Sequence, residues 1–118
     1  MNKYLPSATI SLKKPCIRIH KDTIHLLGDP NYILLSIDIN DKSLVITPSI
    51  QLDTNAHYIG KYLHNNSKSI VLYSKPLIDT FKDINKELIQ DKSYKLYGIA
   101  SADKSGVKIK IEGAVLIN

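Results

Sequence analysis

The sequence predicts an α+β fold, a mainly-β barrel in which two tandem repeats form a pseudo-dimer within one chain. First, each half reads as strand, helix, strand, turn, strand. Second, Tyr32–Ile37 matches Tyr94–Ile99 62 positions later, and Asp41-Lys42-Ser43 matches Asp103-Lys104-Ser105 at the same offset. Third, neither half, at roughly 50–60 residues, can cover its own apolar faces. The halves should therefore interleave into one closed barrel flanked by helices, forming a single domain over residues 1–118.

Residues 8–48 form the first repeat. Ala8–Leu12 alternates polar and apolar residues, which is typical of a strand. Ile17 and Ile19 share one face of a second strand, and Arg18 lies on the other. The remaining elements are a helix starting near Asp22 and stopped by Gly28 and Pro30, a strand over Tyr32–Ile39, a polar turn at Asn40–Ser43, and a returning strand over Leu44–Thr47 that Pro48 ends.

Residues 49–68 form a connector with few signals. Asp53-Thr54-Asn55 predicts an Asx-type turn, and the segment after it, through Ile59, is either a short helical piece or extended. Gly60 and His64–Ser67 continue the connector, which should have no core of its own.

Residues 69–118 form the second repeat. Ser69–Tyr73 is a strand, Ser74 is an N-cap, and Pro76 lies in the first turn of the helix that follows. Four apolar residues spaced four, three and four apart form its buried stripe: Leu77, Phe81, Ile84 and Leu88. After the strand that contains Tyr94–Ile99, the expected elements are a returning strand at Gly106–Ile111, a bulge or turn at Glu112-Gly113, and a last strand at Ala114–Ile117.

Charge and composition limit the function classes. The chain has 118 residues, a formal charge of +5 and a pI near 9.3, which permits nucleic acid or another acidic partner. The basic side chains are 15 lysines and one arginine, a bias that an AT-rich coding sequence also produces. We expect a cytoplasmic protein, because no apolar run is long enough for a membrane helix, the N-terminus lacks a signal-peptide pattern, and Cys16 is the one cysteine.

One stretch resembles a known family. Residues Ile17-Arg18-Ile19-His20 through Leu26-Leu27-Gly28, followed by Tyr32–Thr47, are similar to the AbrB/SpoVT/MazE swapped-hairpin proteins. The resemblance implies a strand, a short helix ending in Leu-Gly, and a hairpin exchanged between two copies. It also implies binding to DNA or, for the MazE-like members, to a toxin.

A second resemblance covers nearly the whole chain. The sequence is similar to uncharacterised small proteins of low-GC Gram-positive bacteria and their phages. The similar segments are Thr9-Ile10-Ser11, Leu26–Tyr32, Asp53–Ala56 and Ser69-Ile70-Val71. This resemblance implies a cytosolic protein of phage or prophage origin and no particular chemistry.

Basic residues at two junctions are the candidate nucleic-acid contacts. The first group lies around the first strand–helix junction and consists of Lys13, Lys14, Arg18, His20, Lys21 and His25. The second, at the corresponding place in the other half, consists of Lys68, Lys75 and Lys82. A pseudo-twofold protein would present both groups on one face to the phosphates of double-stranded DNA. With a single arginine, we expect little bidentate reading of guanine, so phosphate contacts should dominate.

The alternative is a protein-binding module, including a phage-encoded inhibitor of a host protein. Tyrosines would then be the anchors, namely Tyr58, Tyr62, Tyr73, Tyr94 and Tyr97. Self-association is compatible with both functions.

The sequence predicts no enzyme, metal site or cofactor. His20 and His25 are five residues apart and His57 and His64 seven apart, and neither is the i, i+4 spacing that places two imidazoles side by side on one helical face. Cys16 starts a strand among apolar neighbours, where a buried, inert thiol is expected.

Overall fold

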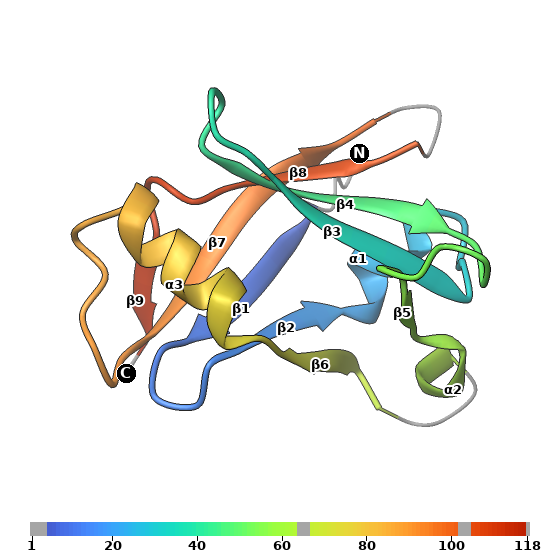
Figure 1. The fold of residues 1–118 in the computed structure, drawn as a ribbon, viewed down its shortest axis with the longest axis horizontal. Coiled ribbons are helices and arrows are strands. Elements are labelled where there is room, and N and C mark those ends of the chain that lie inside the picture. The colour runs from blue at the N-terminus through green and yellow to red at the C-terminus, as the bar shows by residue number, and fades with distance from the viewer. Residues whose placement is uncertain (1–4, 64–66, 102–104, 118) are drawn as a thin grey trace.

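The chain forms a strongly curled antiparallel sheet with a few short helices (Figure 1). The structure is a computed structural model that describes residues 5–63, 67–101 and 105–117. In chain order its elements are β1 (Ser7–Ser11), β2 (Cys16–His20), α1 (Lys21–His25), β3 (Tyr32–Asp38), β4 (Ser43–Ser49), β5 (His57–Tyr58), α2 (Gly60–Leu63), β6 (Ser69–Tyr73), α3 (Lys75–Ile84), β7 (Ser93–Ala100), β8 (Val107–Lys110) and β9 (Val115–Ile117).

The strands follow the order β5-β3-β4-β8-β7-β1-β2-β6, and β9 pairs with β7. Figure 1 shows β3, β4 and β8 in one layer and β1, β2 and β6 in a facing layer, with β7 running between them. The expected mainly-β, curled architecture is therefore confirmed. Between the described residues, no pairing joins β5 to β6, so the sheet is a half-barrel there instead of the closed barrel expected.

The inner faces of the two layers enclose one apolar core. Alternation along β2 places Ile17 and Ile19 in this core and Arg18 in solvent, as predicted. The helices contribute Ile24 from α1 and Phe81 from α3, both fully buried. Among the described residues, no helix is long and apolar enough to cross a membrane.

Helix α3 begins as predicted and ends earlier. Ser74 Oγ accepts a hydrogen bond from Leu77 N–H at 3.3 Å, which confirms the N-cap. The expected continuation to Leu88 is wrong, because Asn85 leaves the helix in an extended conformation. Its amide Nδ2 donates to Ile111 O at 2.9 Å, and its Oδ1 accepts from Glu87 N–H. This buried asparagine ties the end of α3 to the segment after β8.

The connector contributes more than the sequence predicted. The Asx-type turn at Asp53 is confirmed, since Oδ1 accepts from Asn55 N–H at 2.9 Å. Beyond it, β5 pairs with the start of β3, and Ile59 is fully buried. This segment therefore adds a short strand and a buried side chain to the common core.

Pro48 does not end its strand, contrary to the prediction. It pairs with Ile33 within β4, which continues to Ser49. Because β8 pairs only with residues 43–46 of β4, Pro48 lies beyond that ladder, where a residue without an N–H is tolerated.

The two matched segments occupy related places. Tyr32 starts β3 and Tyr94 is the second residue of β7, and each of these strands is the first strand of a hairpin. The loops of the two hairpins differ in length. The last pair before the loop is Asp38 with Ser43 in the first hairpin and Ala100 with Val107 in the second. Asp103 and Lys104, from the second matched motif, lie outside the described residues.

Strand β7 makes the two layers continuous. Its residues 93–97 pair with β1, and residues 98–100 pair with β8. At the change of partner, Gly98 N–H donates to Pro6 O at 2.9 Å. A Cβ on Gly98 would lie 1.8 Å from Lys108 O and 2.6 Å from Ile109 Cα, both backbone atoms that no rotamer change can move. Glycine is therefore required at this crossing.

We predict that Gly98→Ala destabilises the fold by about 3 kcal/mol, since the added methyl forces β7 and β8 apart. Urea unfolding followed by circular dichroism measures this change. Gly106→Ala is the matched control, because its Cβ would meet Thr47 Cγ2 at 3.4 Å, and we expect a loss below about 1 kcal/mol. Equal losses in the two variants would contradict the proposed close approach.

Candidate nucleic-acid interface

The main candidate site is a hollow of about 590 Å³ on the outer face of β1 and β2, next to the turn that joins them. We call it the basic hollow. Its cations are Lys13 and Lys14 from the turn and Arg18 from β2, all exposed. Three hydroxyl side chains on neighbouring strands line it as well, namely Thr9, Ser11 and Ser93. The alternation that buries Ile17 and Ile19 is what turns Arg18 toward this hollow.

The charge in the basic hollow is not neutralised. None of the described residues that line it is acidic. Among the residues that the structure describes, no carboxylate lies within ion-pair distance of Lys13, Lys14 or Arg18. Three cations in a concave surface with hydroxyl donors form a site suited to an anion of the size of a phosphodiester.

A second, smaller hollow collects the remaining predicted residues of the first junction. His20, Lys21 and His25 line a space of about 340 Å³ together with Lys68 from the other half of the chain. Lys21 N–H donates to Lys68 O at 3.0 Å, which joins the two halves here. We call this space the histidine hollow. Asp22 also lines this hollow, so the positive charge of the hollow is partly offset. A hydrogen bond joins His25 Nδ1 to Asp29 Oδ1.

The structure groups the predicted residues differently from the sequence. The first group divides between the two hollows, and Lys68 joins residues of the first group in the histidine hollow instead of lying with Lys75 and Lys82. The two hollows are neighbours, because Arg18 and His20 are two residues apart on β2 and point to the same side.

Lys75 and Lys82 lie on α3, in neither hollow. Lys75 Nζ is 2.8 Å from Asp79 Oδ2, and Lys82 Nζ donates to Gln90 Oε1 at 3.0 Å. Lys75 is therefore neutralised by a carboxylate, and Lys82 is held by an amide oxygen. Both are poorer candidates for phosphate contact than the cations of the basic hollow.

The lysines of β8 are neutralised by the β3–β4 hairpin. Lys108 Nζ lies 3.2 Å from Asp38 Oδ2 and 3.1 Å from Asp41 Oδ2, and Lys110 Nζ lies 2.9 Å from Asp41 Oδ1. The hydrogen bonds from Lys110 and Lys108 lower the pKa of Asp41 to about 2. A hydrogen bond from the N–H of Asp41 lowers the pKa of Asp38, and a hydrogen bond from Lys108 lowers it further. These ion pairs connect two strands and leave little free charge on this layer.

Cys16 and His20 do not form a catalytic or metal-binding pair. They occupy opposite ends of β2, about 13 Å apart along the strand. Within the described residues, no group of three or more His, Cys, Asp or Glu side chains is arranged to hold a metal ion. Cys16 is half-buried and lines the basic hollow.

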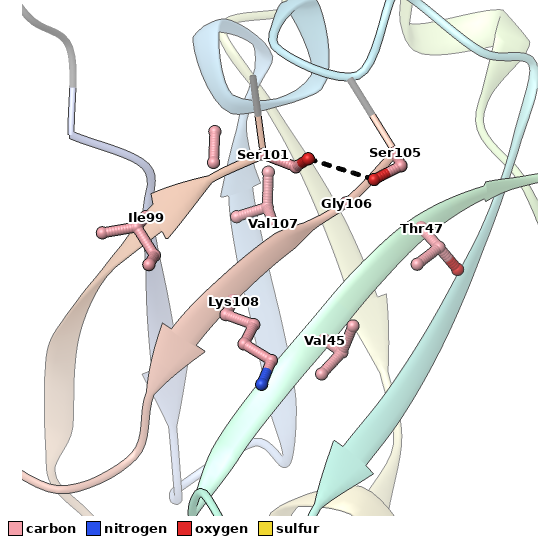
Figure 2. Close-up of a pocket in the computed structure, with 9 residues that line it drawn as sticks. Val45, Thr47, Ile99, Ser101, Ser105, Gly106, Val107 and Lys108 are labelled. Carbon is pink, nitrogen blue, oxygen red and sulfur yellow. Dashed lines mark hydrogen bonds between the residues drawn. The ribbon is translucent and has the colours of Figure 1, made fainter. Parts of the chain in front are cut away.

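A third hollow, of about 350 Å³, lies on the opposite layer and is mostly apolar. Figure 2 shows Val45, Ile99 and Val107 around it, with Lys108 at one side. A hydrogen bond from Ser105 Oγ to Ser101 Oγ spans one end at 3.1 Å (Figure 2). This apolar hollow contains none of the residues predicted as nucleic-acid contacts.

The sequence prediction missed the hydroxyl residues of the basic hollow and Lys95 of β7. The register pairs Thr9 with both Arg18 and Lys95, so these three side chains lie in one row across the sheet. The alternation of the predicted first strand could have identified two of these hydroxyl residues, because Thr9 and Ser11 are its outward positions. What the sequence could not supply was the pairing of β7 with β1.

Comparisons with protein-family models, with curated proteins and with solved structures gave no match for this chain.

The ion pairs around Asp41 predict a pH-dependent contribution to stability. The folded-state pKa of about 2 lies below the ordinary 3.8, so the stabilisation is complete above about pH 4 and is lost as the pH falls toward 2. We expect Asp41→Asn to lower the Tm by a few degrees at pH 7 and by almost nothing below pH 2.

Thermal scans from pH 7 to below pH 2 measure this difference. Asp83→Asn is the control, because Asp83 is highly exposed and its pair with Lys86 spans 3.8 Å, so its Tm should barely change at any pH. A Tm difference for Asp41→Asn that persists unchanged at pH 2 would show that its cause is not ionic.

Proposed function

We propose that this protein binds DNA through the basic hollow, mainly by phosphate contacts, and acts as a regulatory protein of the AbrB-like kind. The observation that carries the proposal is the unneutralised group Lys13, Lys14 and Arg18 in a concave surface without acidic lining. The neighbouring histidine hollow extends the same surface along β2. With one arginine in the whole chain, the expected binding is weakly specific for sequence.

The finer fold assignment belongs to the same proposal. The chain would be a tandem pair of swapped-hairpin repeats, β2-α1-β3-β4 and β6-α3-β7-β8, acting as an intrachain pseudo-dimer. Two pairings support it: β2 lies antiparallel to β6, and β4 antiparallel to β8, as strands related by a twofold axis do. The axis of the first pairing would pass near Arg18 and Val71, the central pair, which puts Arg18 at the centre of the DNA-facing side.

A protein-binding module, such as an inhibitor of a host protein, is the second candidate. The observation that favours it is the apolar hollow, beside which Ile99 is 68% exposed. Capture of partners from a cytosolic extract with and without nuclease separates the two functions. Partners held by this hollow would survive nuclease and be lost in Ile99→Asp, whereas nucleic-acid-mediated capture would disappear after nuclease.

We predict that changing Lys13, Lys14 and Arg18 together to Ala weakens binding to random-sequence DNA at low salt by at least about tenfold. Removing three phosphate contacts should also make the slope of log K against log salt shallower by about 2 to 3. Fluorescence anisotropy titrations at several salt concentrations give both quantities.

The control removes the same charge elsewhere. Lys61, Lys82 and Lys86, on α2, on α3 and after α3, are changed together to Ala, and we expect affinity and slope to stay within about twofold of the wild-type values. Lys82 thereby also tests the second predicted group. No binding by the wild-type protein, or equal losses in the two triple variants, would refute the proposed function.

A further inference from the structure

We infer that the ligand of the basic hollow is single-stranded nucleic acid, with bases stacked on Tyr73 and Tyr97. The inference rests on the proposed function and narrows it, because the sequence alone favoured double-stranded DNA. It comes from the arrangement of aromatic, basic and hydroxyl side chains across the outer face of four neighbouring strands: β7, β1, β2 and β6.

The strand register places these side chains in two rows. Residues directly opposite one another on neighbouring antiparallel strands point to the same side of the sheet. One row, from β7 to β6, is Lys95, Thr9, Arg18 and Val71. The adjacent row is Ser93, Ser11, Cys16 and Tyr73. Two cations, three hydroxyls and an aromatic ring, together with Val71 and Cys16, thus share a surface about 14 Å wide, three strand spacings across.

Both tyrosines leave a large part of their surface in water. The Tyr73 residue is 71% exposed at the end of β6, where it lines the basic hollow. Tyr97 is 43% exposed on β7, two residues beyond Lys95, whose Nζ lies 5.4 Å from its ring centroid. By contrast, Tyr94 on the inner face is buried and its hydroxyl accepts from Ile89 N–H. A base stacked on Tyr73 or Tyr97 would cover apolar surface that the fold leaves in water.

The shape of this face suits a single strand better than a duplex. Reading a duplex requires an element that protrudes into a groove, usually a helix or a two-stranded ribbon. Here the surface is hollow, and three small hydroxyl side chains, Thr9, Ser11 and Ser93, line it beside Arg18 and Tyr73. Paired bases inside a duplex cannot reach the tyrosine rings, whereas the unpaired bases of a single strand can. The cations at the turn would then follow its backbone, and the hydroxyls would donate to or accept from base edges.

The test compares three labelled probes by fluorescence anisotropy at low salt, namely oligo-dT, oligo-rU and a mixed-sequence DNA duplex, each about 12 nucleotides long. We expect at least one of the single strands to bind about tenfold more tightly than the duplex. For that strand the salt slope should be close to −3, because Lys13, Lys14, Arg18 and Lys95 each contribute about −0.7.

Variants of the exposed tyrosines test the stacking. We expect Tyr73→Ala and Tyr97→Ala each to weaken single-strand binding about tenfold and duplex binding less than twofold. Tyr73→Phe should keep the affinity, because its ring still stacks. Tyr58→Ala, which removes an exposed tyrosine outside this face, is the control and should leave all affinities unchanged. Circular dichroism verifies that each variant is folded.

The outcomes separate this inference from the proposed function. Duplex binding equal to or tighter than single-strand binding, or single-strand affinity insensitive to Tyr73→Ala and Tyr97→Ala, overturns the single-strand inference and leaves DNA binding standing. Failure of all three probes to bind overturns the proposed function and this inference together.

Discussion

The close approach of β7 and β8 at Gly98 is the constraint on which the rest of the structure depends. Without a Cβ, Gly98 allows Lys108 O to approach its Cα while its N–H bonds to Pro6 O. One strand can then belong to both layers, and the sheet curls over its core. The same strand carries Lys95 and Tyr97 on its outer face, so the residue that shapes the core also positions part of the candidate interface.

Local features of the fold were predictable because they depend on neighbouring residues. Ser74 as an N-cap, the polar turn before Ser43 and the inward Ile17 and Ile19 follow from capping, turn chemistry and alternation. Features set by distant partners were not predictable. Pro48 lies where β8 has stopped short of it, and α3 ends before Leu88, where Asn85 bonds to Ile111 O.

The candidate site shows the same division between local and distant information. That Lys13, Lys14 and Arg18 are outward and close together follows from one turn and one strand. The pairing of β6 with β2 then brings Tyr73 to this group and Lys68 to His20, and no local pattern carries that register. The match between Tyr32–Ile37 and Tyr94–Ile99 correctly indicates two hairpins. It does not show that Gly98, aligned with Ser36, has a separate role at the crossing of the layers.

Amino-acid composition alone does not explain where the charged side chains lie. A lysine-rich coding bias accounts for how many cations the chain has but not for where their partners lie. Asp38 and Asp41 gather beside Lys108 and Lys110 and hold the hairpin to β8. The opposite layer presents Lys13, Lys14 and Arg18 with no carboxylate lining their hollow. Scattered charge would give both layers a similar mixture of signs. Like charges that lie close together on a surface repel one another in the free protein. An anionic ligand relieves this repulsion when it binds. The uneven distribution of charge is therefore the physical basis for expecting an anionic ligand.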